Sequence, residues 1–197
     1  MIAVSEEIQQ RALQVVDRLA TSYPNSKCSL EFTSPFQLLV ATILAAQCTD
    51  ERVNTVTPAL FARFPTPAAF ADAPLEEIQT AIRSTGFYRN KARHIQGACR
   101  MILATFGGAV PRTMAELLLL PGVARKTANV VMSNGYDQVE GVVVDTHVGR
   151  ISRRLGLTVS EDPVRVERDL MALLPRTEWR DYNHRLIDHG RAICKAP

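Results

Sequence analysis

Residues 117–131 read LLLLPGVARKTANVV and predict two short helices joined by a tight turn. The apolar first helix ends at Pro121, and the second helix begins at Arg125. Gly122 can adopt a positive φ and leaves room for a close backbone approach. The first N–H groups of the second helix have no partner within it, and such groups bind phosphate. With Lys126 beside them, the stretch fits either a phosphate-binding hairpin or an ordinary helical corner with a surface lysine.

Helical signals recur along the rest of the chain. Ser5 and Ser34 precede helices as N-cap residues, and Thr113 with Glu116 fits a capping box. The apolar stretch 36–46 has no polar face, which predicts a buried central helix. No pair of alternating runs is joined by a hairpin turn, so we expect an all-α protein. Further helices are predicted over residues 51–64, 90–106, 147–155, 163–174 and 179–190.

The composition is that of an ordinary globular protein. Of 197 residues, 46% are hydrophobic and 22% are charged, which excludes disordered, collagen-like and disulfide-scaffold classes. The net charge of +3 permits an anionic partner without requiring one. The four cysteines form no CxxC pair and the chain opens with no secretory leader, so we expect a cytoplasmic protein with free thiols. The longest apolar stretch is too short to span a bilayer, so no membrane association is expected.

A second informative segment is Val144–Arg150, which reads VDTHVGR. Taken with the hairpin, it resembles the motifs of the endonuclease III family of DNA glycosylases. The family hairpin usually reads LPGVGxKTA, and here Ala124 stands in place of its second glycine. Matching stretches cover residues 34–41, 44–50, 86–92 and 189–194, so the resemblance spans about residues 32 to 194.

The resemblance implies a catalytic lysine and a catalytic carboxylate. Lys126 would attack the sugar of the damaged nucleotide and form a Schiff base, after which β-elimination breaks the strand. An amine attacks only when it is neutral, and a helix N-terminus in a dry cleft disfavours the cation. Asp145 would stabilise the oxocarbenium-like sugar and help to move protons, although Asp is also a common N-cap. One helix and one loop lie between Lys126 and Asp145 in the sequence, so the two side chains can face a single cleft.

The resemblance also implies DNA contacts. A glycosylase flips its target out of the duplex, and Gln47 would fill the gap while Phe87 wedges into the opposite strand. The alternatives are that Gln47 is a helix C-terminal residue and Phe87 a core aromatic. The hairpin contacts to DNA would come from Gly122, Val123, Ala124 and Arg125.

Other polar residues have two interpretations each. His147 is either a DNA contact or, as we favour, a structural histidine beside the cap. Asp50 is either an N-cap, which we also favour, or part of a DNA-facing loop. Six basic residues are either phosphate contacts or members of solvated faces, namely Arg89, Lys91, Arg93, Arg150, Arg153 and Arg154.

The family normally binds a [4Fe–4S] cluster through four cysteines spaced C-x6-C-x2-C-x5-C. Here Cys194 matches the first ligand, and the sequence stops inside the spacer that follows it. The other three cysteines match no ligand position, and one thiolate cannot hold a cluster that needs four. The chain is a piece of a longer protein that carries the cluster, or a relative that lost it, or Cys194 is an ordinary residue. We favour the first interpretation.

These inferences predict two helical domains with a DNA-binding cleft between them. One is a six-helix domain over residues 29–140 that holds the hairpin, and the other joins residues 1–28 to residues 141–197. The expected function is base excision repair by a bifunctional glycosylase that removes oxidised pyrimidines and cleaves the strand. The expected partner is double-stranded DNA with damaged bases or abasic sites, bound by a monomer associated with the nucleoid. The alternatives are a monofunctional glycosylase, which Lys126 disfavours, and a non-catalytic helix-hairpin-helix module.

Overall fold

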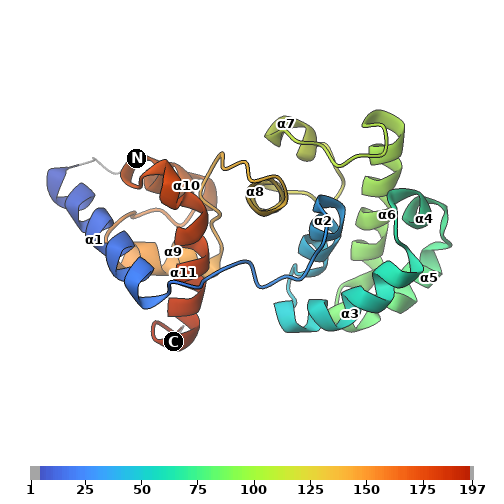
Figure 1. The fold of residues 1–197 in the computed structure, drawn as a ribbon, viewed down its shortest axis with the longest axis horizontal. Coiled ribbons are helices and arrows are strands. Elements are labelled where there is room, and N and C mark those ends of the chain that lie inside the picture. The colour runs from blue at the N-terminus through green and yellow to red at the C-terminus, as the bar shows by residue number, and fades with distance from the viewer. Residues whose placement is uncertain (1–4, 196–197) are drawn as a thin grey trace. The chain divides into compact units, whose positions relative to one another are not determined.

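The protein is described by a computed structural model over residues 5–195, and every regular element in that range is a helix (Figure 1). The all-α expectation is confirmed. Contacts along the chain divide it into two compact units, residues 29–138 and residues 1–28 together with 139–197. None of the helices in residues 5–195 is both long and apolar enough to cross a bilayer.

The unit of residues 29–138 is built around α2 (Pro35–Leu44). Ser34 caps this helix by accepting a hydrogen bond from the N–H of Gln37, as its position before a proline predicts. Six of its residues are buried, which confirms a central helix with no polar face; they are Leu38, Leu39, Val40, Ala41, Ile43 and Leu44. The helix ends at Leu44, earlier than predicted, and the chain then turns toward Gln47.

The remaining helices of this unit include one long helix, α6. They are α3 (Asp50–Arg63), α4 (Pro67–Asp72), α5 (Leu75–Ala81), the 3-10 turn η1 (Arg83–Thr85), the long α6 (Tyr88–Thr105), α7 (Met114–Leu117) and α8 (Arg125–Val130). Both α4 and α5 lie against α6 (Figure 1). The N-cap of α3 is Thr49, whose hydroxyl accepts from the N–H of Arg52. The prediction that Asp50 is the cap is therefore wrong, because Asp50 is already the first residue of the helix.

The sequence did not predict one element of this unit. After α8 the chain continues as a π-helical turn, η2 (Val131–Gly135). The carbonyl of Val130 accepts from the hydroxyl of Ser133 at 3.4 Å and from the amide of Asn134 at 3.2 Å. Such side-chain donors compete with the regular helical ladder and loosen it. The turn packs closely on α2, since a Cβ on Gly135 would lie 3.4 Å from Pro35.

The second unit combines the N-terminal helix with the C-terminal part of the chain. Its elements are α1 (Glu6–Ser22), α9 (Thr146–Arg154), α10 (Pro163–Leu173), η3 (Arg176–Glu178) and α11 (Trp179–Ala192). Both α1 and α9 lie against α11. Ser5 caps α1 as predicted, and the three predicted C-terminal helices are confirmed with ends shifted by a residue or two. The core includes Ala12, Val148, Leu170, Tyr182 and Leu186.

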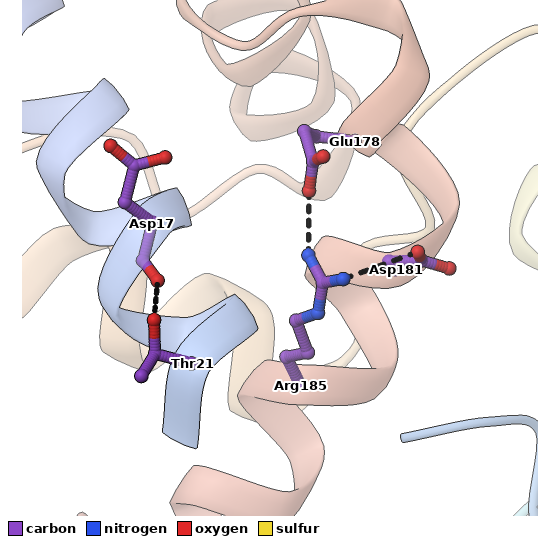
Figure 2. Close-up of polar contacts among 5 residues, drawn as sticks. All are labelled: Asp17, Thr21, Glu178, Asp181 and Arg185. Atoms are coloured by element: carbon purple, nitrogen blue, oxygen red, sulfur yellow. Dashed lines mark hydrogen bonds and ion pairs between the residues drawn. The ribbon is translucent and has the colours of Figure 1, made fainter. Parts of the chain in front are cut away.

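A partly buried ion-pair network lies at the start of α11. Figure 2 shows Arg185 donating to Glu178 at 2.6 Å and to Asp181 at 3.3 Å. The Arg185 side chain is 13% exposed, whereas its partner Asp181 is 44% exposed, so only the bond to Glu178 is largely shielded from solvent. The same figure shows Thr21 donating from its hydroxyl to the carbonyl of Asp17, one turn earlier in α1. Arg185 thus joins η3 to α11, whose N-cap position has no side-chain cap.

Candidate active site

The hairpin is present as predicted, and its glycine is required by the packing. Gly122 has φ 78°, and a Cβ placed there would lie 2.7 Å from the Cβ of His94 on α6. Real Cβ contacts are longer than that, so only glycine fits at this turn. Val123 is 8% exposed and its N–H donates to the carbonyl of Leu120. The side chain and the backbone N–H of Val123 therefore both make their contacts within this unit.

Lys126 stands in the first turn of α8. Its side chain is exposed, as is Ala124 at the N-cap position, whereas Arg125 between them is half-buried. The amine of Lys126 is therefore accessible from solvent, which a nucleophile acting on a large substrate needs.

A cavity of about 420 Å³ lies beside the hairpin. Three of the residues predicted to contact DNA line it together, namely Gln47, Phe87 and Gly122. They come from three separate segments of the unit: the loop after α2, the residue before α6 and the hairpin turn. The rest of the lining is Ile43, Ala46, Asn90, Lys91 and His94.

Gln47 and Phe87 both protrude from strained loops. Gln47 has φ 55° and is exposed, and it lies beyond the end of α2 rather than in that helix. Phe87 has φ 47° and is 67% exposed. The core-aromatic alternative for Phe87 is therefore wrong. Left-handed backbone at residues other than glycine is costly and gathers at functional sites.

Lys91 fits neither of its two interpretations, a phosphate contact or a member of a solvated face. It is 4% exposed, and its ammonium donates to the carbonyls of Leu44 and Thr85, both at 2.7 Å. Burial lowers the pKa of Lys91, and the nearby Cys48 opposes this effect. Because the amine faces two backbone carbonyls, it is a poor rival to Lys126 as nucleophile. The sequence did hold a signal, since Lys91 shares the helical face of the buried Ile95.

Asp145 is the N-cap of α9 in the other unit. Its Oδ1 accepts from the N–H of Val148 at 2.8 Å, so the capping interpretation is confirmed. This bond uses one carboxylate oxygen and fixes the rotamer of the side chain.

His147 follows directly in α9. Its ring lies against Gly190 of α11, where any side chain would collide with its Nδ1. Arg150 lies 3.4 Å from the same nitrogen. This packing favours the structural interpretation of His147.

The other basic candidates have partners inside their own units. Arg150 donates to the carbonyl of Cys194 at 2.6 Å, and Arg154 donates to the Cys194 sulfur at 3.0 Å. The remaining contacts join Arg153 to the carbonyl of Ser160, Arg93 to Asn90, and Arg89 to the ring of Tyr88. A phosphate would have to compete with these interactions.

The cysteines present do not form the ligand set of an iron–sulfur cluster. Within residues 5–195, no three His, Cys, Asp or Glu side chains gather as a metal site. Cys48 and Cys99 belong to the unit of residues 29–138, whereas Cys28 and Cys194 belong to the other unit. Burial raises the pKa of the Cys99 thiol to about 12, which makes it a poor metal ligand. Cys194 contacts two arginines of α9, because Arg150 donates to its carbonyl and Arg154 to its sulfur.

Comparisons with known proteins agree with this geometry. Residues 40–176 match the family model for the HhH-GPD superfamily base excision DNA repair protein. Endonuclease III of Synechocystis sp. (strain ATCC 27184 / PCC 6803 / Kazusa) is 57% identical over 188 residues, which is 95% of this chain and 86% of that protein. Endonuclease III of Bacillus subtilis (strain 168) is 47% identical over 182 residues, 92% of this chain and 83% of that protein.

A solved structure is also similar over nearly the whole chain. The structure of a trapped endonuclease III–DNA covalent intermediate superposes with a TM-score of 0.92 at 45% identity, covering 98% of this chain and 90% of that one. The chain therefore belongs to the HhH-GPD superfamily and, within it, to the endonuclease III family. It is a base excision repair enzyme with DNA glycosylase and abasic-site lyase activity. The endonuclease III family is known to carry a [4Fe–4S] cluster.

Proposed function

We propose that this enzyme excises oxidised pyrimidines from duplex DNA and breaks the strand beside the abasic sugar, using the amine of Lys126. The observation that carries the proposal is the exposure of Lys126 directly after the hairpin turn. It is supported by the related endonuclease III whose solved structure is a trapped covalent intermediate with DNA. Such an intermediate needs a nucleophile, and Lys126 is the accessible amine of this motif.

The proposed reaction begins with attack of the neutral Lys126 amine on C1′ of the damaged nucleotide. The bond from C1′ to the base breaks, and the base leaves with the electron pair and takes up a proton. The sugar ring then opens to a Schiff base with Lys126. Loss of a proton from C2′ expels the 3′ phosphate, which completes the β-elimination.

Asp145 is proposed to act on the same sugar. A carboxylate stabilises the positive charge that develops at C1′ and can receive the proton that the lysine loses. The bond from the Val148 N–H to Oδ1 supports this role, because it holds the carboxylate in one orientation before substrate arrives. His147 then has a supporting role, since its packing on Gly190 fixes the first turn of α9.

Two side chains are proposed to replace the extruded nucleotide. Phe87 enters the opposite strand as an apolar wedge, and Gln47 fills the gap and faces the unpaired base. Their shared position on one cavity and their exposure support this assignment. Gly122, Ala124 and Arg125 are proposed to contact the DNA backbone.

Borohydride trapping tests the proposal. Duplexes that hold one thymine glycol or one abasic site should give a covalent adduct with the parent protein and none with Lys126→Ala. Lys27→Ala, which removes an exposed lysine outside the motifs, is the matched control and should retain the adduct. Base release without an adduct would identify a monofunctional glycosylase, and binding without base release would identify a non-catalytic module.

A further inference from the structure

The buried ammonium of Lys91 joins the two loops that carry Gln47 and Phe87. Its Nζ donates to the carbonyl of Leu44, the last residue of α2, and to that of Thr85, the last residue of η1. Both hydrogen bonds are 2.7 Å long, and all three residues are buried. Carbonyls at helix C-termini lack intrahelical partners and carry partial negative charge, so one cation satisfies two helix ends at once.

Each of these two helix ends is followed, two or three residues later, by a residue with strained backbone. Gln47 follows the end of α2 with φ 55°, and Phe87 follows η1 with φ 47°. In residues 5–195 only one other residue that is not glycine has a positive φ, namely Asp137. Such conformations persist only where the surrounding structure enforces them. The shared ammonium is the polar contact that reaches both loops.

Helix α6 extends the same arrangement to the hairpin. His94, one turn after Lys91, packs under Gly122, and a Cβ on Gly97 would lie 3.3 Å from Pro121. The loop after α2, the segment before α6 and the hairpin turn are thus all anchored on one face of α6. The cavity of about 420 Å³ lies among them.

We propose that Lys91 is a positioning residue that holds the Gln47 and Phe87 loops at a fixed separation, so that both side chains enter lesion-containing DNA together. The inference rests on the proposed insertion of these two side chains. Lys91 acts through these loops rather than on the substrate, because it is 4% exposed and its ammonium donates to two backbone carbonyls. Its loss therefore affects recognition of the lesion rather than binding of undamaged duplex through the hairpin.

Gln96 provides a matched control on the same helix. It is also buried, and its amide donates to the carbonyls of Phe70 at 3.2 Å and Ala73 at 2.8 Å. Gln96→Met and Lys91→Met each remove two hydrogen bonds from one buried side chain of similar length. Only Lys91→Met removes the contact that joins the Gln47 and Phe87 loops.

The experiment compares dissociation constants for a duplex with one reduced abasic site and for the same duplex undamaged. It also records the fluorescence of 2-aminopurine placed opposite the abasic site, which rises when inserted side chains unstack this base. In Lys91→Met, the preference for the abasic duplex should fall about tenfold or more, and the fluorescence rise should disappear. Binding of undamaged duplex should stay within about twofold of the parent. Gln96→Met should keep both the preference and the fluorescence rise.

The outcomes separate this inference from the proposed function. If Gln47→Ala and Phe87→Ala keep the full preference for abasic DNA, the insertion proposal itself is wrong. If those variants lose it but Lys91→Met keeps it, only the role of Lys91 is overturned. An equal loss in Lys91→Met and Gln96→Met would also overturn it, because general loosening would then explain both. Should Lys91→Met fail to fold by circular dichroism, Lys91→Gln is judged by the same criteria.

Discussion

The Cβ of His94 occupies the space that a side chain on Gly122 would need, at 2.7 Å from the position of its Cβ. Gly122→Ala therefore meets both a steric collision and a positive φ of 78°. The free energy of unfolding should fall by about 2 kcal/mol or more, as for other strained backbone sites. Urea denaturation of the parent and the Gly122→Ala proteins measures this loss of stability.

Gly107 is the control for that substitution. Gly107 also has a positive φ, 61°, but a Cβ there would meet nothing within 4 Å. Gly107→Ala should lose only about 1 kcal/mol, the cost of the left-handed conformation. Equal losses at Gly122 and Gly107 would contradict the account of the hairpin, because the contact with His94 would then have no cost.

Asp145 has a capping role and a proposed chemical role, which one substitution can separate. Asn caps helices about as well as Asp, so Asp145→Asn should change the free energy of unfolding by less than about 0.5 kcal/mol. Its single-turnover rate of base release should fall on the order of 100-fold or more, because the carboxylate charge is lost. Asp162→Asn at the N-cap of α10 makes the same exchange away from the site and should leave the rate unchanged. If the Asp145→Asn protein is fully active, Asp145 acts only as a helix cap and its proposed chemical role is wrong.

Phe87 should matter for recognition and hardly at all for folding. Its side chain is 67% exposed, so Phe87→Ala should change the free energy of unfolding by less than about 0.5 kcal/mol. The preference for abasic over undamaged duplex should fall severalfold in a competition binding assay. Phe70→Ala, at a fully buried ring, should instead lose about 3–5 kcal/mol of stability. A Phe87→Ala protein that unfolds as readily as Phe70→Ala would contradict the exposed position.

Because His184 is buried, we expect the protein to lose stability in acid. Burial lowers the pKa of His184 below its ordinary value of 6.5, while the nearby carboxylates of Asp181 and Asp188 act in the opposite direction. The unfolded chain therefore binds a proton more readily than the folded protein, so the free energy of unfolding falls as the pH drops below about 6.5.

His184→Gln should weaken that dependence. Between about pH 7.5 and 5.5, its urea midpoint should fall less than that of the parent protein. His94→Gln, at an exposed histidine, is the control and should follow the parent. A parent-like slope in His184→Gln would show that other groups cause the acid sensitivity.

Local signals in the sequence predicted much of the fold because they act over a few residues. Ser5, Ser34 and Thr113 each accept a hydrogen bond from an N–H three residues ahead, which needs only the local chain. The apolar stretch that became α2 was recognisable as a central helix for the same reason. The positive φ of Gly122 likewise follows from residue type.

The features that sequence reasoning missed depend on partners distant in the chain. Lys91 looked like a surface cation, but its carbonyl partner on Leu44 is 47 residues away. The positive φ values of Gln47 and Phe87 have no sequence signature, because neither residue is glycine. At the η2 turn, Ser133 and Asn134 donate to the carbonyl of Val130, and residue types alone do not decide whether side chains bond the backbone in this way.

The most direct test of the central claim is to locate the covalent bond itself. A borohydride-trapped complex with abasic DNA is digested, and mass spectrometry identifies the peptide that carries the sugar. The account predicts that the remnant is attached to the ε-amino group of Lys126. Attachment to Lys91, Lys27 or the N-terminal amine in the parent protein would contradict it.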